Sequence, residues 1–257
     1  MTETVLMADM TWPDYEAKVK AGAPILLPVG SIEQHSYHMP LGVDRYLPTA
    51  VAKEAAAKVG AIVAEPIIYG ARSQMRMGGG QTYPGTTSLS PVTLMHVIRD
   101  VLTAFIEHGA KRIAVVNGHY ENMMFTYEGI DLALREATLR GIDDVRAIRL
   151  EYWDHMSKET IAHLWPDGFP GTELEHAALF ETSLMLHYHP DLVDMAKVPH
   201  EAPGDFPVYD LFPASRDGVP PSGALSPPNR ATAAFGARIA DDCVKGLVGD
   251  LKEAFGL

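Results

Sequence analysis

The sequence has little cysteine, no long apolar run and no excess of basic residues. Its one cysteine, Cys243, lies in a stretch whose pattern is typical of a C-terminal helix. An intramolecular disulfide and a cysteine-based metal site are therefore excluded. This cysteine usage fits a reducing compartment, so we expect a cytoplasmic protein.

Nowhere do about 18 apolar residues follow one another, as a membrane-spanning helix would require. The first residues also lack the basic and apolar segments of an export signal, so we expect neither membrane insertion nor export. Acidic residues outnumber basic residues by 33 to 21, which gives a net charge of −12. A chain of this sign repels phosphate, so nucleic acid is not an expected partner.

What the sequence does contain is an alternation of strand and helix patterns. Four short apolar runs are typical of buried parallel strands, at residues 25–29, 61–68, 112–116 and 145–151. Helical patterns cover residues 47–59, 91–108, 122–140, 173–187 and 230–255. The alternation predicts an α/β fold, a three-layer α/β/α arrangement around a central, mostly parallel sheet.

A proline-rich stretch lies between the last two helical patterns. Residues 190–228 hold nine of the 19 prolines, interleaved with Phe206, Tyr209, Leu211 and Phe212. This composition is too apolar for a solvated linker. We expect an ordered loop that either packs against another subunit or lies on the surface of a monomer.

Two of the predicted strands are each followed by a glutamate and a histidine spaced two apart. Glu33 and His35 come after the strand at 25–29, and His119 and Glu121 come after the strand at 112–116. Residues with this spacing face one side of extended backbone. Because open α/β sheets bind ligands at the carboxyl ends of their strands, we expect both pairs to converge on one crevice.

Asp44 is a fifth candidate ligand, on a predicted turn before the helix at 47–59. Three carboxylates would repel one another without a cation, and with two imidazoles they form a ligand set suited to zinc or manganese. If Asp44 bridges, five ligands serve two metals roughly 3.5–4 Å apart, with a hydroxide between them as nucleophile. Each residue alone is more often a surface group, so the prediction rests on their joint pattern.

His176 follows Glu173 and Glu175 near the start of a helical pattern. A histidine titrates near neutrality and can protonate a departing nitrogen, although spacing alone favours a histidine on a helix surface. The three glycines at 78–80 either bring backbone amides close to a substrate or form a plain turn. No Gly-Lys-Ser/Thr follows them, so a phosphate-binding loop is not supported.

Several segments together resemble a known family. They are residues 27–35, 42–44, 78–80, 84–88, 117–122, 175–176 and 180–183. In these segments, which span nearly the whole chain, the sequence resembles the creatininase (creatinine amidohydrolase) family. The resemblance implies one creatininase-like metal-dependent amidohydrolase domain over residues 1–257, a dinuclear zinc or manganese centre, and assembly into a homohexamer.

The resemblance also implies roles for individual residues. One metal would be held by Glu33, Asp44 and His119, and the other by His35, Asp44 and Glu121. His176 and Glu121 would be the catalytic residues. The implied substrate-binding positions are Met77, Tyr120, Trp153, Thr172, Glu173 and His176.

Three of these positions depart from the family pattern. Thr172 stands where a lid tryptophan covers the substrate ring in creatininase, Glu173 replaces an aspartate, and Met77 replaces a serine that contacts the substrate. Trp153 keeps the other pocket tryptophan. A thioether in place of a small polar group favours a different or larger ring than creatinine.

The sequence therefore predicts a hydrolase that acts on a non-peptide C–N bond in a small cyclic amide, such as creatinine or a related lactam or hydantoin. The alternatives are creatinine–creatine interconversion with a rebuilt lid, and the deformylase and peptide-trimming activities of family relatives. A further alternative, from a different class of protein, is a metal-binding structural subunit that has lost catalytic turnover. An intact Asp44, Glu121 and His176 argue against it, since a retired site has no need of acid-base groups beside its ligands.

Overall fold

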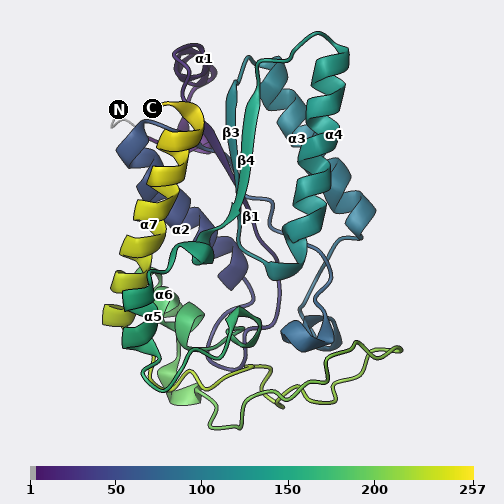
Figure 1. Cartoon of the computed structure of the whole chain (residues 1–257), viewed down its shortest axis with the longest axis vertical. Helices are drawn as coiled ribbons and strands as arrows, with labels where there is room; N and C mark the ends of the chain where they lie inside the picture. The colour runs from purple at the N-terminus through teal and green to yellow at the C-terminus, as the bar shows by residue number, and fades with distance from the viewer. Residues whose placement is uncertain (1–3) are drawn as a thin grey trace.

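The centre of the molecule is a parallel four-stranded sheet (Figure 1), seen in a computed structural model that describes residues 4–257. Its strands lie in the order β2-β1-β3-β4, and each neighbouring pair is parallel. They are β1 (Ile25–Val29), β2 (Ile62–Val63), β3 (Arg112–Asn117) and β4 (Arg146–Glu151). The chain leaves β1 toward β2 on one side and later enters β3 on the other. The crevice for a ligand is therefore expected beyond the carboxyl ends of β1 and β3.

Helices cover both faces of the sheet, which confirms the predicted three-layer α/β/α fold. Figure 1 shows α2 (Val43–Val59) and α7 (Ala233–Phe255) on one side and α3 (Pro91–Glu107) and α4 (Met123–Leu139) on the other. Helix α6 (Leu179–Tyr188) packs against α7 and α2. Two apolar cores result, one on each face of the sheet.

Strand β1 divides its side chains between these two cores. Leu26 packs in the core on the α2 and α7 side, while Ile25 and Leu27 pack in the core on the α3 and α4 side. All of its residues are buried. A strand covered on both faces needs apolar residues at every position, which explains the uninterrupted run in the sequence.

The remaining elements are short. Helices α1 (Trp12–Lys20) and α5 (Lys158–Leu164) have no counterpart in the prediction. Eight 3-10 turns lie in the connections of the described residues: Met7–Asp9, Met75–Met77, Gly80–Thr82, Tyr120–Asn122, Tyr152–His155, Thr172–Leu174, Pro190–Leu192 and Met195–Lys197. Within residues 4–257, no helix combines the length and apolarity that a membrane crossing needs.

Two predicted elements are shorter in the structure than in the sequence pattern. The strand expected at 61–68 pairs only over Ile62–Val63 and then touches β1 again at a single bridge through Ile67. Pro66 lies between these contacts and has no N–H to donate to a ladder. The helix expected at 173–187 begins only at Leu179, because Ala177 just before it has a positive φ of 52°.

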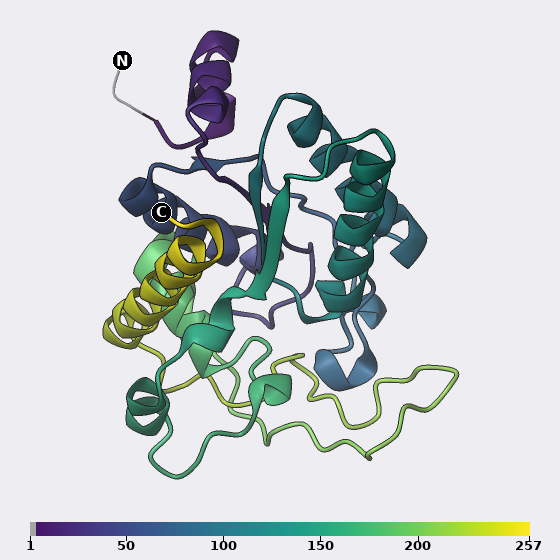
Figure 2. The ribbon, with the colours of Figure 1, turned by 45° about the horizontal axis from the view of Figure 1, so that its top comes forward.

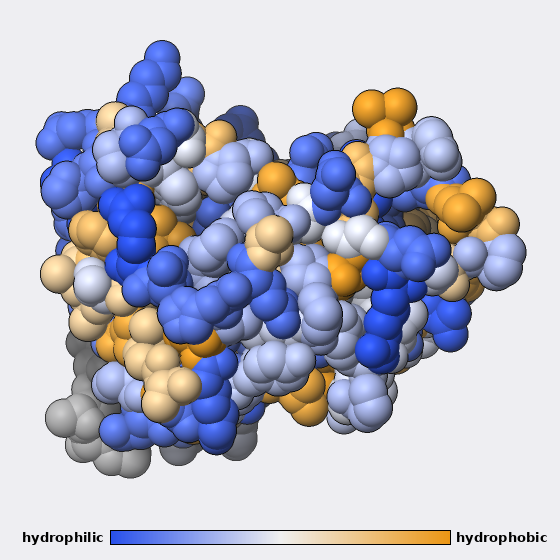
Figure 3. All heavy atoms as spheres, turned by 90° about the horizontal axis from the view of Figure 1, so that it is seen from below, coloured by the Kyte–Doolittle hydropathy of each residue, from blue (hydrophilic) through white to orange (hydrophobic). Residues whose placement is uncertain are grey.

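The proline-rich stretch forms an arm, defined here as residues 203–219, that runs out from the body and back (Figures 1 and 2). It contains no helix or strand. Its side chains Val208, Tyr209, Leu211 and Phe212 are exposed, Val208 to 96% and Phe212 to 81%. Figure 3 shows the molecule from below, with apolar side chains gathered on the lobe that projects at the right.

We expect Gly236→Ala to destabilise the fold by about 1–3 kcal/mol, because overpacking forces helices apart. A Cβ at Gly236 on α7 would collide with the carbonyl oxygen of Ser183 on α6. The matched control is Gly249→Ala on the same helix, where a Cβ meets nothing within 4 Å. That change should instead stabilise the helix by about 0.5–1 kcal/mol. Urea denaturation of both variants measures the difference, and equal midpoints would show that the α6–α7 contact is not tight.

Candidate metal centre

Glu33, Asp44 and His119 meet beyond the carboxyl ends of β1 and β3. Ligand atoms of these three side chains lie within 4.8 Å of one another. His119 Nδ1 is 3.3 Å from a Glu33 oxygen and 3.1 Å from Asp44 Oδ2. All three side chains are buried. The sequence-predicted ligands from the two strand ends and from the following helix are therefore brought together.

A second group adjoins the first and shares Asp44 with it. His35 Nε2 lies 3.2 Å from Asp44 Oδ1, the carboxylate oxygen that does not face His119. The same nitrogen is 3.5 Å from an oxygen of Glu181, a residue that the sequence analysis did not single out. Each oxygen of Asp44 thus faces a different imidazole, which is the arrangement of a carboxylate able to bridge two cations.

Asp44 lies in the first turn of α2, not on a turn before the helix as predicted. Its carbonyl oxygen lacks the usual helical donor, because the residue four positions later is Pro48, which has no N–H. A Cβ at either Gly30 or Gly118 would collide with that carbonyl oxygen. Glycine at both strand ends therefore allows β1 and β3 to approach the start of α2, and this approach places the Asp44 carboxylate between the two imidazoles.

Each imidazole is oriented by a backbone carbonyl. His35 Nδ1 donates to the carbonyl of Glu33 at 3.1 Å, and His119 Nε2 donates to the carbonyl of Ala71 at 3.1 Å. These bonds leave His35 Nε2 and His119 Nδ1 facing the carboxylates. Metal-ligating histidines characteristically bond their second nitrogen in this way, which fixes both tautomer and ring direction.

The charges of the centre favour a bound cation. Burial alone would lower the pKa of His35 and of His119, yet the neighbouring carboxylates raise the pKa of both well above its usual value. Burial alone would raise the pKa of Asp44, and the two imidazoles bring it below its usual value. Glu33 Oε1, His35 Nε2 and Asp44 Oδ2 are buried without a hydrogen-bond partner among the described residues. Buried polar atoms of this kind normally have partners, so the side chains present fit divalent cations.

Glu121 lies beside the centre, on the far side of His119 from Asp44. One of its oxygens is 3.3 Å from His119 Nε2, and the other accepts a hydrogen bond from the backbone N–H of Gln74. Burial raises the pKa of Glu121 to about 7, and the charge of Glu33 adds to this effect. Glu121 therefore remains a predicted metal ligand. Glu181, in contrast, lies directly beside His35. The sequence signal that could have found Glu181 is its place in the segment 180–183, one of those that carry the family resemblance.

His176 lies in the turn between the 3-10 turn at Thr172–Leu174 and α6, so the alternative of a histidine on a helix surface is wrong. Its ring packs against the ring of His35, with centroids 4.5 Å apart, and Nδ1 is 3.9 Å from a Glu33 oxygen. A Cβ at Gly78 would collide with this ring. The glycine therefore serves the close packing of His176, which the glycine triplet alone did not reveal.

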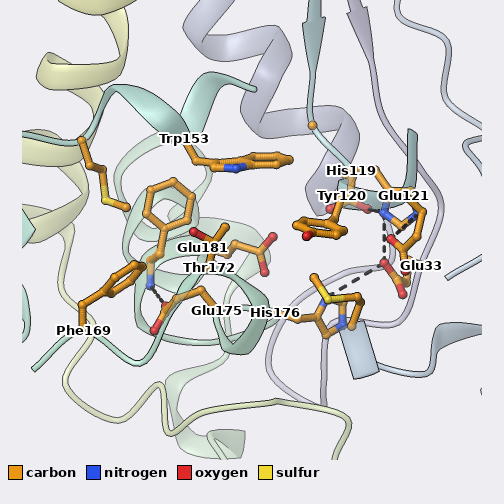
Figure 4. A pocket seen from close by; sticks show the side chains of 15 residues that line it. Glu33, His119, Tyr120, Glu121, Trp153, Phe169, Thr172, Glu175, His176 and Glu181 are labelled. Carbon is orange, nitrogen blue, oxygen red and sulfur yellow. Dashed lines mark hydrogen bonds and ion pairs between the residues drawn. The ribbon is translucent and has the colours of Figure 1, made fainter. Parts of the chain in front are cut away.

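A pocket opens above these residues (Figure 4). Five of the six predicted substrate-binding residues line it: Met77, Tyr120, Trp153, Thr172 and His176. Glu173 is exposed and does not line it. Met156, Phe169 and Phe180 also line it and were not predicted. In Figure 4, Trp153 and Phe169 lie toward the end of the pocket opposite Glu33 and Glu121, and Glu175 lies beside Phe169. One end of the pocket is therefore mainly aromatic, and the other carries Glu33 and Glu121.

Comparison with known proteins gives one consistent family. A family model described as creatininase, creatinine amidohydrolase, matches residues 8–251. The creatinine amidohydrolase of Pseudomonas putida is 45% identical over 257 residues, 99% of each chain. A mycofactocin precursor peptide peptidase of Mycobacterium ulcerans is 32% identical over 266 residues, covering 95% of this chain and 88% of its own.

Solved structures of creatininase match the fold along almost the whole chain. A mutant of the Zn-Zn type has a TM-score of 0.97 at 43% identity, covering 100% of both chains. A creatininase with Mn has a TM-score of 0.97 at 44% identity, and a mutant complexed with creatine has a TM-score of 0.96 at 43% identity. Both cover 99% of this chain and 100% of their own.

We expect metal analysis of the purified protein to find about two divalent cations per chain. Glu181→Gln should lower this content to about one, because the change removes a charge beside His35, whereas Glu33, Asp44 and His119 form a separate group. Asp44→Asn should remove most of both cations, since Asp44 faces both imidazoles. Mass spectrometry of the dialysed, acid-digested protein gives the stoichiometry.

The matched control is Glu175→Gln, a change just before α6 at a buried carboxyl that accepts a hydrogen bond from the backbone N–H of Phe180. Burial raises the pKa of Glu175 to about 8, so the group is already uncharged at neutral pH and the amide changes no charge. This variant should keep about two cations. A Glu181→Gln protein that holds as much metal as the control would remove Glu181 from the centre.

Proposed function

The chain belongs to the creatininase family, and from this premise we propose that it is a metal-dependent amidohydrolase that opens a small cyclic amide at a C–N bond other than a peptide bond. The observation that carries the proposal is the position of Asp44, whose two oxygens face His35 and His119 at the floor of a partly apolar pocket. Its relatives include a creatinine amidohydrolase and a creatininase complexed with creatine.

We assign one cation to Glu33, Asp44 and His119, and the other to His35, Asp44 and Glu121, as predicted. Glu181 is a further proposed ligand of the second cation, which is supported by its 3.5 Å approach to His35. Zinc or manganese fits these oxygen and nitrogen ligands, and both occur in the solved relatives. When bound, the two ions would activate water and polarise the carbonyl of the substrate.

The remaining steps belong to side chains of this chain. His176 takes a proton from the attacking water and returns it to the ring nitrogen as the C–N bond breaks. Glu121 is anchored by the N–H of Gln74 beside the same pocket and stays the second predicted catalytic residue. The hydroxyl of Tyr120 keeps its proton, because burial and the nearby charge of Glu173 raise its pKa. It can therefore donate a hydrogen bond to the substrate.

The aromatic end of the pocket selects the substrate. Trp153 and Phe169 line that end, and Met77 and Met156 line the same pocket. Aromatic and thioether surfaces favour a ring with an apolar substituent and exclude water from the reacting bond. A lactam or hydantoin that carries such a substituent fits this lining better than creatinine, whose only apolar substituent is a methyl group.

A second candidate function is trimming of a peptide, as named for the Mycobacterium ulcerans relative. It is favoured by the continuity of the clefts. Tyr120 and Glu121 line both the catalytic pocket and a neighbouring cleft, which shares Arg72 and Gln74 with a third cleft under the arm. A longer substrate has room to continue along this path. A screen that includes short peptides beside cyclic amides distinguishes the two functions.

We further propose a homohexamer of single-domain chains, spanning residues 1–257, in the cytoplasm. The exposed apolar residues of the arm support a homo-oligomer, because a patch of this kind is usually covered by a partner. The buried free thiol of Cys243 is compatible with a reducing compartment. Sedimentation velocity of the purified protein tests the hexamer, and cell fractionation tests the location.

We expect His176→Ala to lower the turnover of cyclic amides by about 100- to 10,000-fold while both cations stay bound, because the change removes a proton carrier and no proposed ligand. Steady-state kinetics on a panel of creatinine, hydantoins and small lactams, with metal analysis in parallel, measures both effects. The control is His187→Ala, an exposed histidine on α6, which should turn over normally. A normal rate in His176→Ala would exclude this residue from the chemistry.

Met77→Ser should shift specificity toward creatinine. The change replaces a thioether that lines the pocket by a small hydroxyl, so an apolar substituent loses contacts and a polar ring gains a partner. We expect the ratio of kcat/KM for creatinine over that for an alkyl-substituted hydantoin to rise about tenfold or more. An unchanged ratio would show that Met77 does not contact the substrate.

A further inference from the structure

Gln34 is a buried polar residue between two proposed ligands, Glu33 and His35. Its amide nitrogen Nε2 donates to the carbonyl of Gly78 at 3.1 Å and to the carbonyl of Gly223 at 3.0 Å. Its amide oxygen accepts from the N–H of Ser36 at 2.8 Å. These three backbone groups determine the orientation of the amide, because a flipped amide would set oxygen against two carbonyls and nitrogen against an N–H.

His176 touches the same amide. Its Nε2 lies 2.9 Å from Gln34 Nε2 and 2.9 Å from the backbone carbonyl oxygen of Gln34. A primary amide has two N–H groups, and the carbonyls of Gly78 and Gly223 use both. The amide therefore has none left for His176. The hydrogen count therefore favours a ring that carries its own hydrogen on Nε2 and donates it to the Gln34 carbonyl.

The opposite tautomer is disfavoured by hydrogen-bond counting. With its hydrogen on Nδ1, His176 would need an N–H from Gln34, and the carbonyl of Gly78 or of Gly223 would lose its donor. The Gln34 carbonyl would lose its donor at the same time. Two backbone acceptors of this enclosed site would then lack a partner, an arrangement that folded proteins rarely keep.

The packing around the ring of His176 agrees with a hydrogen on Nε2. The backbone of Gly78 lies against the Nε2 and Cδ2 edge of the imidazole, and the ring of His35 lies against the imidazole at a centroid distance of 4.5 Å. Nδ1 is left on the side of Glu33, 3.9 Å from its carboxylate, and His176 lines the pocket (Figure 4). The nitrogen that faces the reacting groups is therefore the one without a hydrogen.

We propose that Gln34 is a positioning residue that holds His176 with Nε2–H on the Gln34 carbonyl, so that Nδ1 is the atom that exchanges a proton with the substrate. This inference rests on the proposed role of His176. Nδ1 takes a proton from water as the new C–O bond forms. It returns that proton to the ring nitrogen of the amide as the C–N bond breaks, so no proton or electron is left over.

The kinetic experiment compares Gln34→Leu with Gln81→Leu in the metal-loaded enzyme, with creatinine as the probe. Gln81 is an exposed glutamine in the neighbouring loop and bonds only Ser88 through its side chain among the described contacts. We expect Gln34→Leu to lower kcat about 100-fold or more, with KM within about threefold and metal content unchanged. Gln81→Leu should behave as the unaltered enzyme. A kcat for Gln34→Leu within about twofold of the control overturns the proposal.

A double variant separates this inference from the proposed function. If Gln34 acts through His176, the variant with both Gln34→Leu and His176→Ala should be no slower than His176→Ala alone. A further loss equal to that of Gln34→Leu alone overturns the coupling. A normal rate in His176→Ala would instead contradict the proposed role of His176. If the unaltered enzyme opens other cyclic amides but does not hydrolyse creatinine, the same variants are assayed with those amides.

Neutron diffraction decides the proton position without any assay, and also if Gln34→Leu does not fold. The unaltered, metal-loaded protein is crystallised in deuterated form at about pH 8, above the usual histidine pKa. We expect a deuteron on Nε2 of His176 that points to the Gln34 carbonyl, and the two amide deuterons of Gln34 on Gly78 and Gly223. A deuteron on Nδ1 with none on Nε2 overturns the proposal.

Discussion

One buried carboxylate, shared between two imidazoles, is the constraint on which the site depends. Asp44 can present one oxygen to His35 and the other to His119 only because β1, β3 and the start of α2 come unusually close. Glycines at both strand ends and a proline inside the helix allow that approach. The same crowding leaves carboxylates and imidazoles with few hydrogen bonds of their own, so a divalent cation completes the arrangement more naturally than a proton does.

The turn before α6 links this centre to acid-base chemistry. Glu181 accepts a hydrogen bond from the N–H of Ala177, while Glu175 accepts one from the N–H of Phe180, so two carboxyl groups brace the turn from opposite ends. His176 lies inside the braced turn, and Ala177 next to it has a positive φ. Glu181, a proposed metal ligand, and His176, the proposed proton carrier, are thus held by one short segment. Loss of the Glu181 brace is expected to disturb both functions together.

The arm is connected to the same turn. The segment that returns from it bonds the site twice, through the Gly223 carbonyl to Gln34 and through the N–H of Leu225 to the carbonyl of His176. The apolar residues at its far end are exposed. A partner subunit that covers them would therefore also hold in place a segment that supports His176, the proposed catalytic histidine.

The sequence by itself determined the layers of the fold and most of the centre. The runs at 25–29 and 112–116 became β1 and β3 because a strand buried on both faces needs apolar residues throughout, and ligands spaced two apart after them had to share a crevice. Only the tertiary structure decided the contacts of Glu181 and Gln34 and the non-helical setting of His176. These depend on the close approach of segments far apart in the chain, and local periodicity carries no information about which distant backbone groups a side chain meets.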